Sequence, residues 1–232
     1  MNVLAINTST NLLHIALQTP HSYESQQVLL DRRFSEALMP KIEHICQKAK
    51  TRLDELSLVV CAKGPGSFTG LRVGMATAKG IALAAGIPFV SISTLEIAAY
   101  PLKECSRPIL VTIDARKNRF YSALFVQGNM VGKEMDGSID QLCAVCAPYN
   151  EVLVTGFDAH TCFPLLCDEV TLTGQKTKFY LDELRYRDYG ESMIQLGTFL
   201  LQSQGADPLG SGPVYIRKSD AELSLKEEVN HE

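Results

Sequence analysis

The sequence has no excess of positive charge. Its 232 residues include 22 lysines and arginines against 26 aspartates and glutamates, which gives a formal net charge of -4. A protein that grips nucleic acid unaided is expected to show a basic face, because phosphate contacts dominate the affinity. No such face is evident in this sequence, so we expect any nucleic acid to be met indirectly, through a partner protein.

Two further absences concern the cellular compartment. The first residues contain no basic segment followed by a long apolar run, so we expect no signal peptide. No stretch approaches the roughly 20 apolar residues that a membrane-spanning helix needs, so we expect no membrane contact. The cysteines are odd in number, seven, at positions 46, 61, 105, 143, 146, 162 and 167. We therefore expect reduced thiols in a cytoplasmic protein.

What the sequence does contain is an alternation of strand and helix patterns. Short apolar runs predict strands over 3–7, 14–18, 58–62 and 89–92, and 23–30 could supply another. Apolar residues at helical spacing predict helices over 35–49, 70–85 and 94–102, with Pro40 kinking the first or delaying its start. Later strands over 109–113, 120–126 and 152–155 and a helix over 188–202 indicate a second unit. We predict an α/β protein with domains 1–103 and 104–232, the second smaller and ending in a flexible tail.

The strongest local signal is a glycine-rich loop, residues 63–70, between a buried strand and a helix. Glycine permits close backbone approach, and a helix N-terminus offers free N–H groups to an anion. The loop is not a P-loop, because no Gly-Lys-Ser/Thr follows. Together with the polar tip of the first hairpin, it gives these candidates for facing a nucleotide or phosphate: Asn7, Thr8, Ser9, Thr10, Gly64, Gly66 and Ser67. The alternative is that both segments are structural turns.

Small residues recur at every fourth position of the helix that follows the loop. This spacing places them on one face and lets another backbone approach closely. Together with the preceding helix, it gives these candidates for binding a partner: Leu38, Ile42, Ile45, Gly70, Gly74, Ala78 and Ala82. The alternative is that the small residues pack inside their own domain.

Five segments in order resemble one family. They are residues 4–10, residues 64–74 with the sequence GPGSFTGLRVG, residues 92–95, residues 113–116 and residues 213–217. The chain is similar to the TsaB (YeaZ) family, strongly to about residue 126 and patchily afterwards. The resemblance implies a duplicated actin-like ATPase (ribonuclease H-like) fold. It also implies a role in making threonylcarbamoyladenosine on tRNA beside the anticodon.

The resemblance also implies partners. TsaB proteins pair with their paralogue TsaD, which transfers the threonylcarbamoyl group, and the P-loop ATPase TsaE joins the assembly. Helices of the N-terminal domain mediate association with TsaD or with a second copy, so a homodimer of the isolated chain is an alternative.

Departures from the family pattern bear on catalysis. The two metal-binding histidines of TsaD align with Thr94 and Ala98, and neither side chain replaces an imidazole. The acid of the first hairpin aligns with Asn7, and a histidine common at the start of the first long helix aligns with Phe34. We therefore predict a non-catalytic scaffold without its own cofactor or metal, with ATP or ADP and a metal in the partner assembly. The alternatives are an ATP-binding enzyme such as a kinase, or a peptidase.

For several other side chains the sequence permits both a functional and a structural interpretation. Cys143 and Cys146 with later cysteines and His160 could bind zinc, but the segment also resembles a buried helical face. We expect His14 and His44 at the surface or its boundary. Asp114 and Arg116 could contact a substrate or cap a turn.

Overall fold

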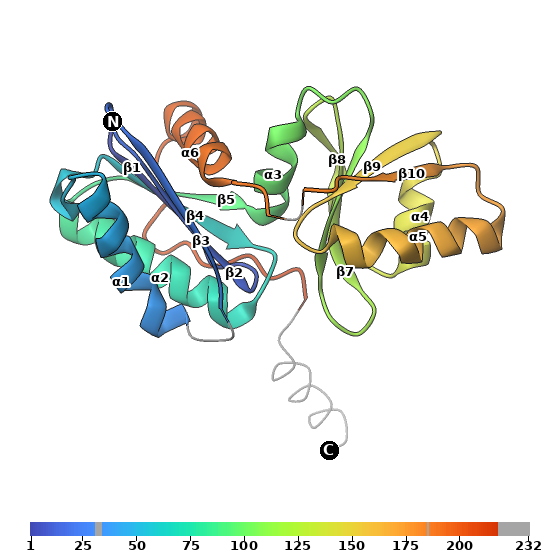
Figure 1. The fold of residues 1–232 in the computed structure, drawn as a ribbon, viewed down its shortest axis with the longest axis horizontal. Coiled ribbons are helices and arrows are strands. Elements are labelled where there is room, and N and C mark those ends of the chain that lie inside the picture. The colour runs from blue at the N-terminus through green and yellow to red at the C-terminus, as the bar shows by residue number, and fades with distance from the viewer. Residues whose placement is uncertain (31–33, 185, 218–232) are drawn as a thin grey trace, which may run out of the picture.

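The computed structural model describes residues 1–30, 34–184 and 186–217 and contains two five-stranded sheets (Figure 1). The first sheet has the order β3-β2-β1-β4-β5, and the second has the order β10-β9-β6-β7-β8. The strands of the first sheet are β1 (Val3–Asn7), β2 (Leu12–Gln18), β3 (Tyr23–Leu29), β4 (Leu58–Gly64) and β5 (Phe89–Ser93). Those of the second are β6 (Ile109–Asp114), β7 (Phe120–Val126), β8 (Asn129–Gly137), β9 (Glu151–Thr155) and β10 (Lys178–Leu181).

The two sheets share one topology. In the first, β1 pairs antiparallel with β2 and parallel with β4. In the second, β6 pairs antiparallel with β7 and parallel with β9. Each sheet is therefore an antiparallel meander extended by two parallel strands that are reached through helical crossovers. The predicted duplicated α/β fold is confirmed, and Asn7 at the end of β1 corresponds in position to Asp114 at the end of β6.

Helices cover the sheets in layers. The helices α1 (Phe34–Lys48) and α2 (Phe68–Ala85) pack on one face of the first sheet, and α3 (Thr94–Ala99) and α6 (Gly190–Gln204) contact residues of its other face. The helices α4 (Ile139–Cys146) and α5 (Ala159–Thr173) cover the second sheet. Two short 3-10 turns lie at Leu53–Glu55 and Tyr100–Leu102. One hydrophobic cluster joins β1, β4 and β5 to β6 and β7 through α3 and α6, so the two units share a core.

The helix α6 departs from the predicted division of the chain. It was assigned with residues 104–232, yet it packs on the first sheet (Figure 1). Gly197 makes this approach close, because a Cβ there would lie 2.4 Å from Val60 Cγ2. The helical pattern revealed an apolar face but not which sheet that face covers. The predicted tail beyond Ser219 lies outside the described residues.

Residues 206–217, which we call the strap, return along the first unit. Asp207 N–H donates to the Phe89 carbonyl at 2.8 Å, and the Asp207 carboxylate accepts the Ser91 N–H at 2.9 Å. Farther along, Val214 N–H donates to the Lys63 carbonyl at 2.7 Å. The strap therefore runs from the edge strand β5 to the glycine-rich loop.

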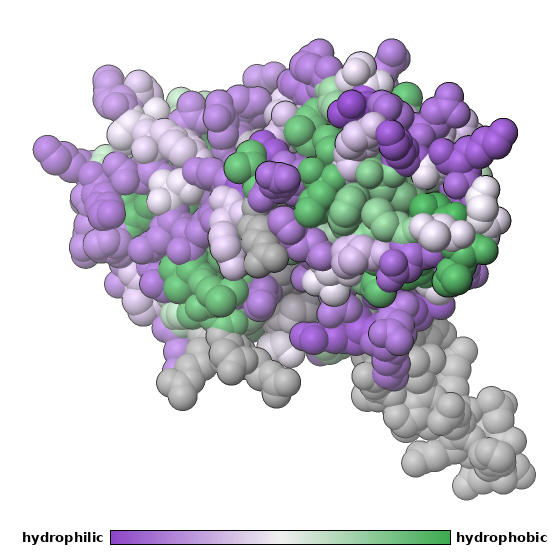
Figure 2. All heavy atoms as spheres, turned by 45° about the vertical axis from the view of Figure 1, so that its right-hand side comes forward, coloured by the Kyte–Doolittle hydropathy of each residue, from purple (hydrophilic) through white to green (hydrophobic). Residues whose placement is uncertain are grey.

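The face shown in Figure 2 is mostly hydrophilic, and its hydrophobic side chains gather mainly in a band toward the right of the view. Helices of the described ranges are all too short or too polar to cross a membrane.

Pro40 lies inside α1, which begins at Phe34, so this proline does not delay the start of the helix.

Candidate functional site

A cleft of about 490 Å³ lies between the two units. Both hairpin tips, the glycine-rich loop and the end of the strap line it. The first unit contributes Ser9, Thr10, Asn11, Gly66, Ser67 and Phe68, and the strap contributes Tyr215 and Arg217. The second unit contributes Ile113, Asp114, Ala115, Arg116, Lys117, Tyr121 and Asp158. The structure therefore brings four of the predicted phosphate-facing residues to one cleft: Ser9, Thr10, Gly66 and Ser67.

The first hairpin tip packs directly on the glycine-rich loop. Ser67 N–H donates to the Ser9 carbonyl at 2.6 Å, and Thr8 Oγ1 donates to the Gly70 carbonyl at 2.8 Å. A Cβ on Gly66 would lie 2.1 Å from the Ser9 carbonyl oxygen, so only glycine permits this contact. The close approach predicted for these glycines is thus made by the chain's own hairpin.

Three of the predicted phosphate-facing residues do not line the cleft. Asn7 is fully buried, and its Oδ1 accepts hydrogen bonds from Ser9 N–H at 2.9 Å and Ser9 Oγ at 2.6 Å. Asn7 Nδ2 has no partner among the described residues. Thr8 is fully buried as well, and a Cβ on Gly64 would lie 2.6 Å from the Val214 carbonyl oxygen. Gly64 therefore admits the strap.

The predicted partner-binding residues are all buried inside the chain. A Cβ on Gly70 or Gly74 would lie 2.1 Å from an oxygen of Thr8, so the small-residue face of α2 receives the hairpin tip. The other five belong to the core between the first sheet and its helices: Leu38, Ile42, Ile45, Ala78 and Ala82. The prediction that these side chains contact a partner is therefore wrong. A spacing of four defines a face, but it does not say whether that face points inward.

The second hairpin tip is exposed and carries cationic side chains. Arg116, Lys117 and Asn118 have φ values of 64°, 55° and 57°, in the left-handed region. Asp114 Oδ1 accepts the Arg116 N–H at 2.7 Å, so this carboxylate caps the turn while it also lines the cleft. Asp114 N–H in turn donates to Asp158 Oδ2 at 2.8 Å. The Arg116 side chain is 87% exposed, with Nη1 3.8 Å from Asp114 Oδ2.

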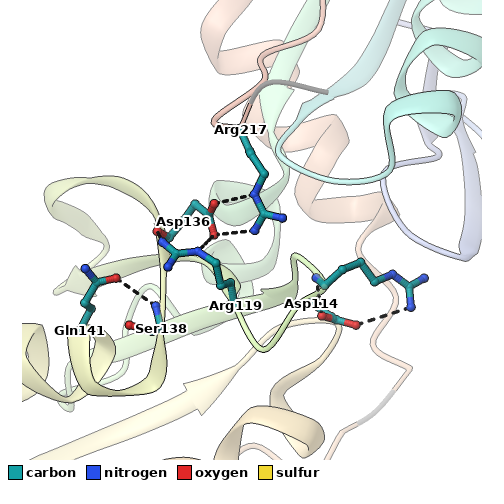
Figure 3. Close-up of polar contacts among 7 residues, drawn as sticks. Asp114, Arg119, Asp136, Ser138, Gln141 and Arg217 are labelled. Atoms are coloured by element: carbon teal, nitrogen blue, oxygen red, sulfur yellow. Dashed lines mark hydrogen bonds and ion pairs between the residues drawn. The ribbon is translucent and has the colours of Figure 1, made fainter. Parts of the chain in front are cut away.

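Asp136 joins the second hairpin to the strap (Figure 3). It accepts from Arg119 Nε at 2.9 Å and from Arg217 Nε at 2.8 Å. Burial raises the pKa of Asp136, but the hydrogen bonds to Arg217 and Arg119 outweigh burial and leave that pKa below its ordinary value. Sequence reasoning missed Asp136, because nothing local in the sequence marks a contact between positions 81 residues apart.

Aromatic rings form the opposite rim of the cleft. The rings of Phe68 and Tyr215 have centroids 4.7 Å apart, and the Arg72 guanidinium lies 3.8 Å from the Phe68 centroid. Arg72 Nε also donates to the Tyr215 hydroxyl at 3.1 Å. These contacts fix the end of the strap against the start of α2.

Of the residues considered for metal binding, His160 and Cys167 are half-buried and the others lie in the core. Thr94 and Ala98 are fully buried, and within the described ranges no three His, Cys, Asp or Glu side chains are placed to hold a metal ion. Three cysteines, which we call the core thiols, pack between α4, α5 and the second sheet: Cys143, Cys146 and Cys162. Burial raises their pKa values to about 11, 12 and 12, respectively, so they remain neutral thiols.

Two further expectations concern aromatic side chains. His14 was expected near the surface but is 1% exposed, with Nε2 2.9 Å from Asp188 Oδ1 and 3.0 Å from Ser25 Oγ. This expectation was wrong because β2 is buried along most of its length. His44 is exposed, and Phe34 is a core residue at the start of α1.

The duplicated sheet order and the cleft between the units define a protein of the actin-like ATPase fold. A family model described as "TsaD: tRNA N6-adenosine threonylcarbamoyltransferase" matches residues 24–192. The TsaB protein of Bacillus subtilis is 28% identical over 96% of each chain. The TsaB protein of Escherichia coli is 33% identical, over 53% of this chain and 54% of its own length. The solved structure of YeaZ from Pseudomonas aeruginosa has the same fold, with a TM-score of 0.71 at 20% identity over 92% of this chain and 99% of that one. The chain belongs to the TsaB (YeaZ) branch of this family.

Proposed function

We propose that this chain is a non-catalytic scaffold subunit in the formation of threonylcarbamoyladenosine on tRNA. Its relatives carry the name "tRNA threonylcarbamoyladenosine biosynthesis protein TsaB". The observation that carries the non-catalytic part is the burial of Thr94 and Ala98, the positions that align with the metal-binding histidines of TsaD. Both are fully buried, and neither offers a ligand for a metal. TsaD would then be the partner that transfers the threonylcarbamoyl group.

The first hairpin supports the same division of labour. Asn7 supplies no negative charge, and its side-chain oxygen Oδ1 already accepts two hydrogen bonds from Ser9. The first hairpin therefore offers no carboxylate to the magnesium ion of a bound triphosphate. The carboxylates of the cleft, Asp114 and Asp158, come from the second unit. ATP or ADP and a metal would accordingly belong to the partner assembly, with TsaE as its ATPase.

The outer face of α1 and α2 is the surface we propose for TsaD. A hollow of about 500 Å³ lies there, and its surface is mostly apolar although Asp54 lies at it. The other lining residues are Met39, Leu53, Thr77, Gly80, Ile81, Ala84 and Ala85. Leu83, on the same helix, is 67% exposed. Together, the hollow and Leu83 make this face our candidate for the interaction site. It replaces the buried residues first predicted for this role.

The primary experiment is co-purification with TsaD of the same organism, followed by threonylcarbamoyl transfer with and without this chain. We expect a complex and transfer that depends on this chain. Absence of a complex, or turnover of ATP by the isolated chain, contradicts the proposal, as does a peptidase activity that a chelator abolishes. Sedimentation of the isolated chain tests the homodimer.

Gly80→Tyr tests the docking face. Gly80 is exposed and nothing lies within 4 Å of a Cβ there, so we expect the fold to tolerate the larger side chain. We expect normal thermal unfolding and loss of the complex with TsaD. The matched control is Ala144→Tyr, at an exposed position of α4. Equal retention of TsaD by both variants would show that this face is not the docking surface.

A further inference from the structure

We propose that the cleft between the two units binds an unpaired nucleotide of RNA, and that this chain thereby contacts the tRNA directly. The inference rests on the proposed function for the identity of the RNA. The groups that carry it are the cationic second hairpin tip, the aromatic rim and the hydroxyls between them.

The two sides of the cleft differ in how far their polar groups are already hydrogen-bonded within the chain. On the first-unit side, the hairpin tip fills the glycine-rich loop, and Ser67 Oγ accepts the Gly70 N–H at 3.3 Å. Ser67 N–H donates a hydrogen bond to the Ser9 carbonyl. Two backbone N–H groups of the loop, those of Ser67 and Gly70, are therefore engaged within the chain. On the second-unit side, the Arg116 side chain is 87% exposed at the mouth of the cleft.

The charged side chains of the cleft come mainly from its second-unit side. The lining contains three cationic side chains, Arg116, Lys117 and Arg217, and two acidic ones, Asp114 and Asp158. Arg217 is paired with Asp136, so the cations of the hairpin tip are Arg116 and Lys117. They lie close together on a chain whose formal net charge is -4, and they are the groups that a phosphate would contact.

Aromatic rings in the same cleft favour the binding of a base as well as a phosphate. Phe68, Tyr121 and Tyr215 all line the cleft. Proteins that bind single-stranded RNA stack unpaired bases on aromatic or arginine side chains and contact the backbone with cations. The exposed Ser67 hydroxyl lies in the same cleft and is suited to hydrogen bonding with a ribose 2′-hydroxyl, whereas Ser9 Oγ already donates to Asn7 Oδ1.

Ion pairs also connect two separate parts of the cleft wall. Asp136 holds both Arg119, at the base of the second hairpin, and Arg217, at the end of the strap (Figure 3). The hairpin tip and the aromatic rim are therefore tied to a common carboxylate. A site held in this way needs little ordering when a ligand binds.

The test is charge reversal at the tip in the reconstituted complex with TsaD. The variant Arg116→Glu/Lys117→Glu is compared with the control Lys133→Glu/Lys176→Glu, which reverses two exposed lysines outside the cleft lining. We expect the KM for tRNA to rise about tenfold in the tip variant with kcat unchanged, and no change in the control. The dependence of binding on salt should weaken by about 0.7 in logarithmic slope per phosphate contact removed. Arg116→Gln, a milder change, should show a smaller rise if the double variant folds poorly.

A direct measurement separates this inference from the proposed function. Fluorescence anisotropy of a labelled anticodon stem-loop RNA is recorded with the full chain and both variants, with Mg-ATP as competitor. If transfer requires the chain but KM and RNA binding match the control, the RNA site is overturned and the scaffold role stands. If transfer does not require the chain, the scaffold role fails, and anisotropy alone decides the RNA site. Tight binding of Mg-ATP that displaces the RNA would identify a nucleotide site and overturn the inference.

Discussion

Two glycines of α2 should respond in opposite ways to the same substitution. Gly80 is exposed, and a Cβ there has nothing within 4 Å. Replacing a helical glycine by alanine at such a position stabilises a protein by about 1 kcal/mol, because the unfolded chain loses conformational freedom. We therefore expect Gly80→Ala to raise the free energy of unfolding by about that amount.

Gly74→Ala meets a different environment. Its new Cβ would lie 2.1 Å from Thr8 Oγ1 and 3.2 Å from Thr8 Cβ. Thr8 cannot rotate away freely, because it is fully buried and its hydroxyl donates to the Gly70 carbonyl at 2.8 Å. Overpacking costs about 1–3 kcal/mol and loss of the hydrogen bond about 1 kcal/mol, against a helix-propensity gain of about 1 kcal/mol. The expected result is a net destabilisation of roughly 1–3 kcal/mol.

Urea unfolding followed by circular dichroism measures both variants. A double-mutant cycle with Thr8→Ala isolates the contact, because that change removes the clashing oxygen. We expect Gly74→Ala to cost less in the Thr8→Ala background than in the natural chain. If Gly74→Ala stabilises the protein as Gly80→Ala does, the inward-facing assignment of the small-residue face is refuted.

Three further predictions concern other parts of the chain. Burial raises the pKa of Asp188, but hydrogen bonds from His14 and the Gly190 N–H leave it well below its ordinary value. This carboxylate therefore stabilises the fold above about pH 4, and that stability is lost as the pH falls through the folded value. Asp188→Asn should flatten the acid side of the stability curve, and an unchanged curve contradicts the stabilising role of this carboxylate. The core thiols should resist alkylation at about pH 8 in the folded chain while Cys105 reacts, as peptide mass spectrometry can show; equal labelling would place them outside the core. Asp207→Ala removes the acceptor for Ser91 and should cost about 1–3 kcal/mol and expose the strap to protease; a natural digestion pattern would mean that the strap is held elsewhere.

The sequence predicted elements well where the pattern was apolar and local. The buried strand over 58–62 and the helix over 70–85 appear as Leu58–Gly64 and Phe68–Ala85. The strand β8 was not predicted, because it is an edge strand whose side chains are largely exposed and do not alternate. The helix α5 was missed as well, and it contains Pro164, which breaks the usual helical signal.

The site was only partly predictable for a different reason. The hairpin tip and the glycine-rich loop were recognised separately, but their contact depends on the parallel pairing of β1 with β4. For the second hairpin tip the sequence permits two roles. The structure shows that Asp114 caps the turn, while contact with a substrate stays a prediction for a residue that also lines the cleft. The contacts of Arg217 and of α6 join residues far apart in the sequence. Such contacts follow from the packing of whole elements, and no single segment encodes them.

The duplication shows what the replacement of an acid by Asn7 preserves. Asp114 Oδ1 accepts the N–H of the residue two positions later, and Asn7 Oδ1 accepts the Ser9 N–H in the same way. The amide therefore keeps the turn-forming hydrogen bond and removes only the negative charge. Because Asn7 is fully buried, a carboxylate there would lie in the interior without a cation among its described contacts, at a considerable desolvation cost. An asparagine at this position therefore lets the hairpin fold without a bound metal, as the proposed scaffold role requires.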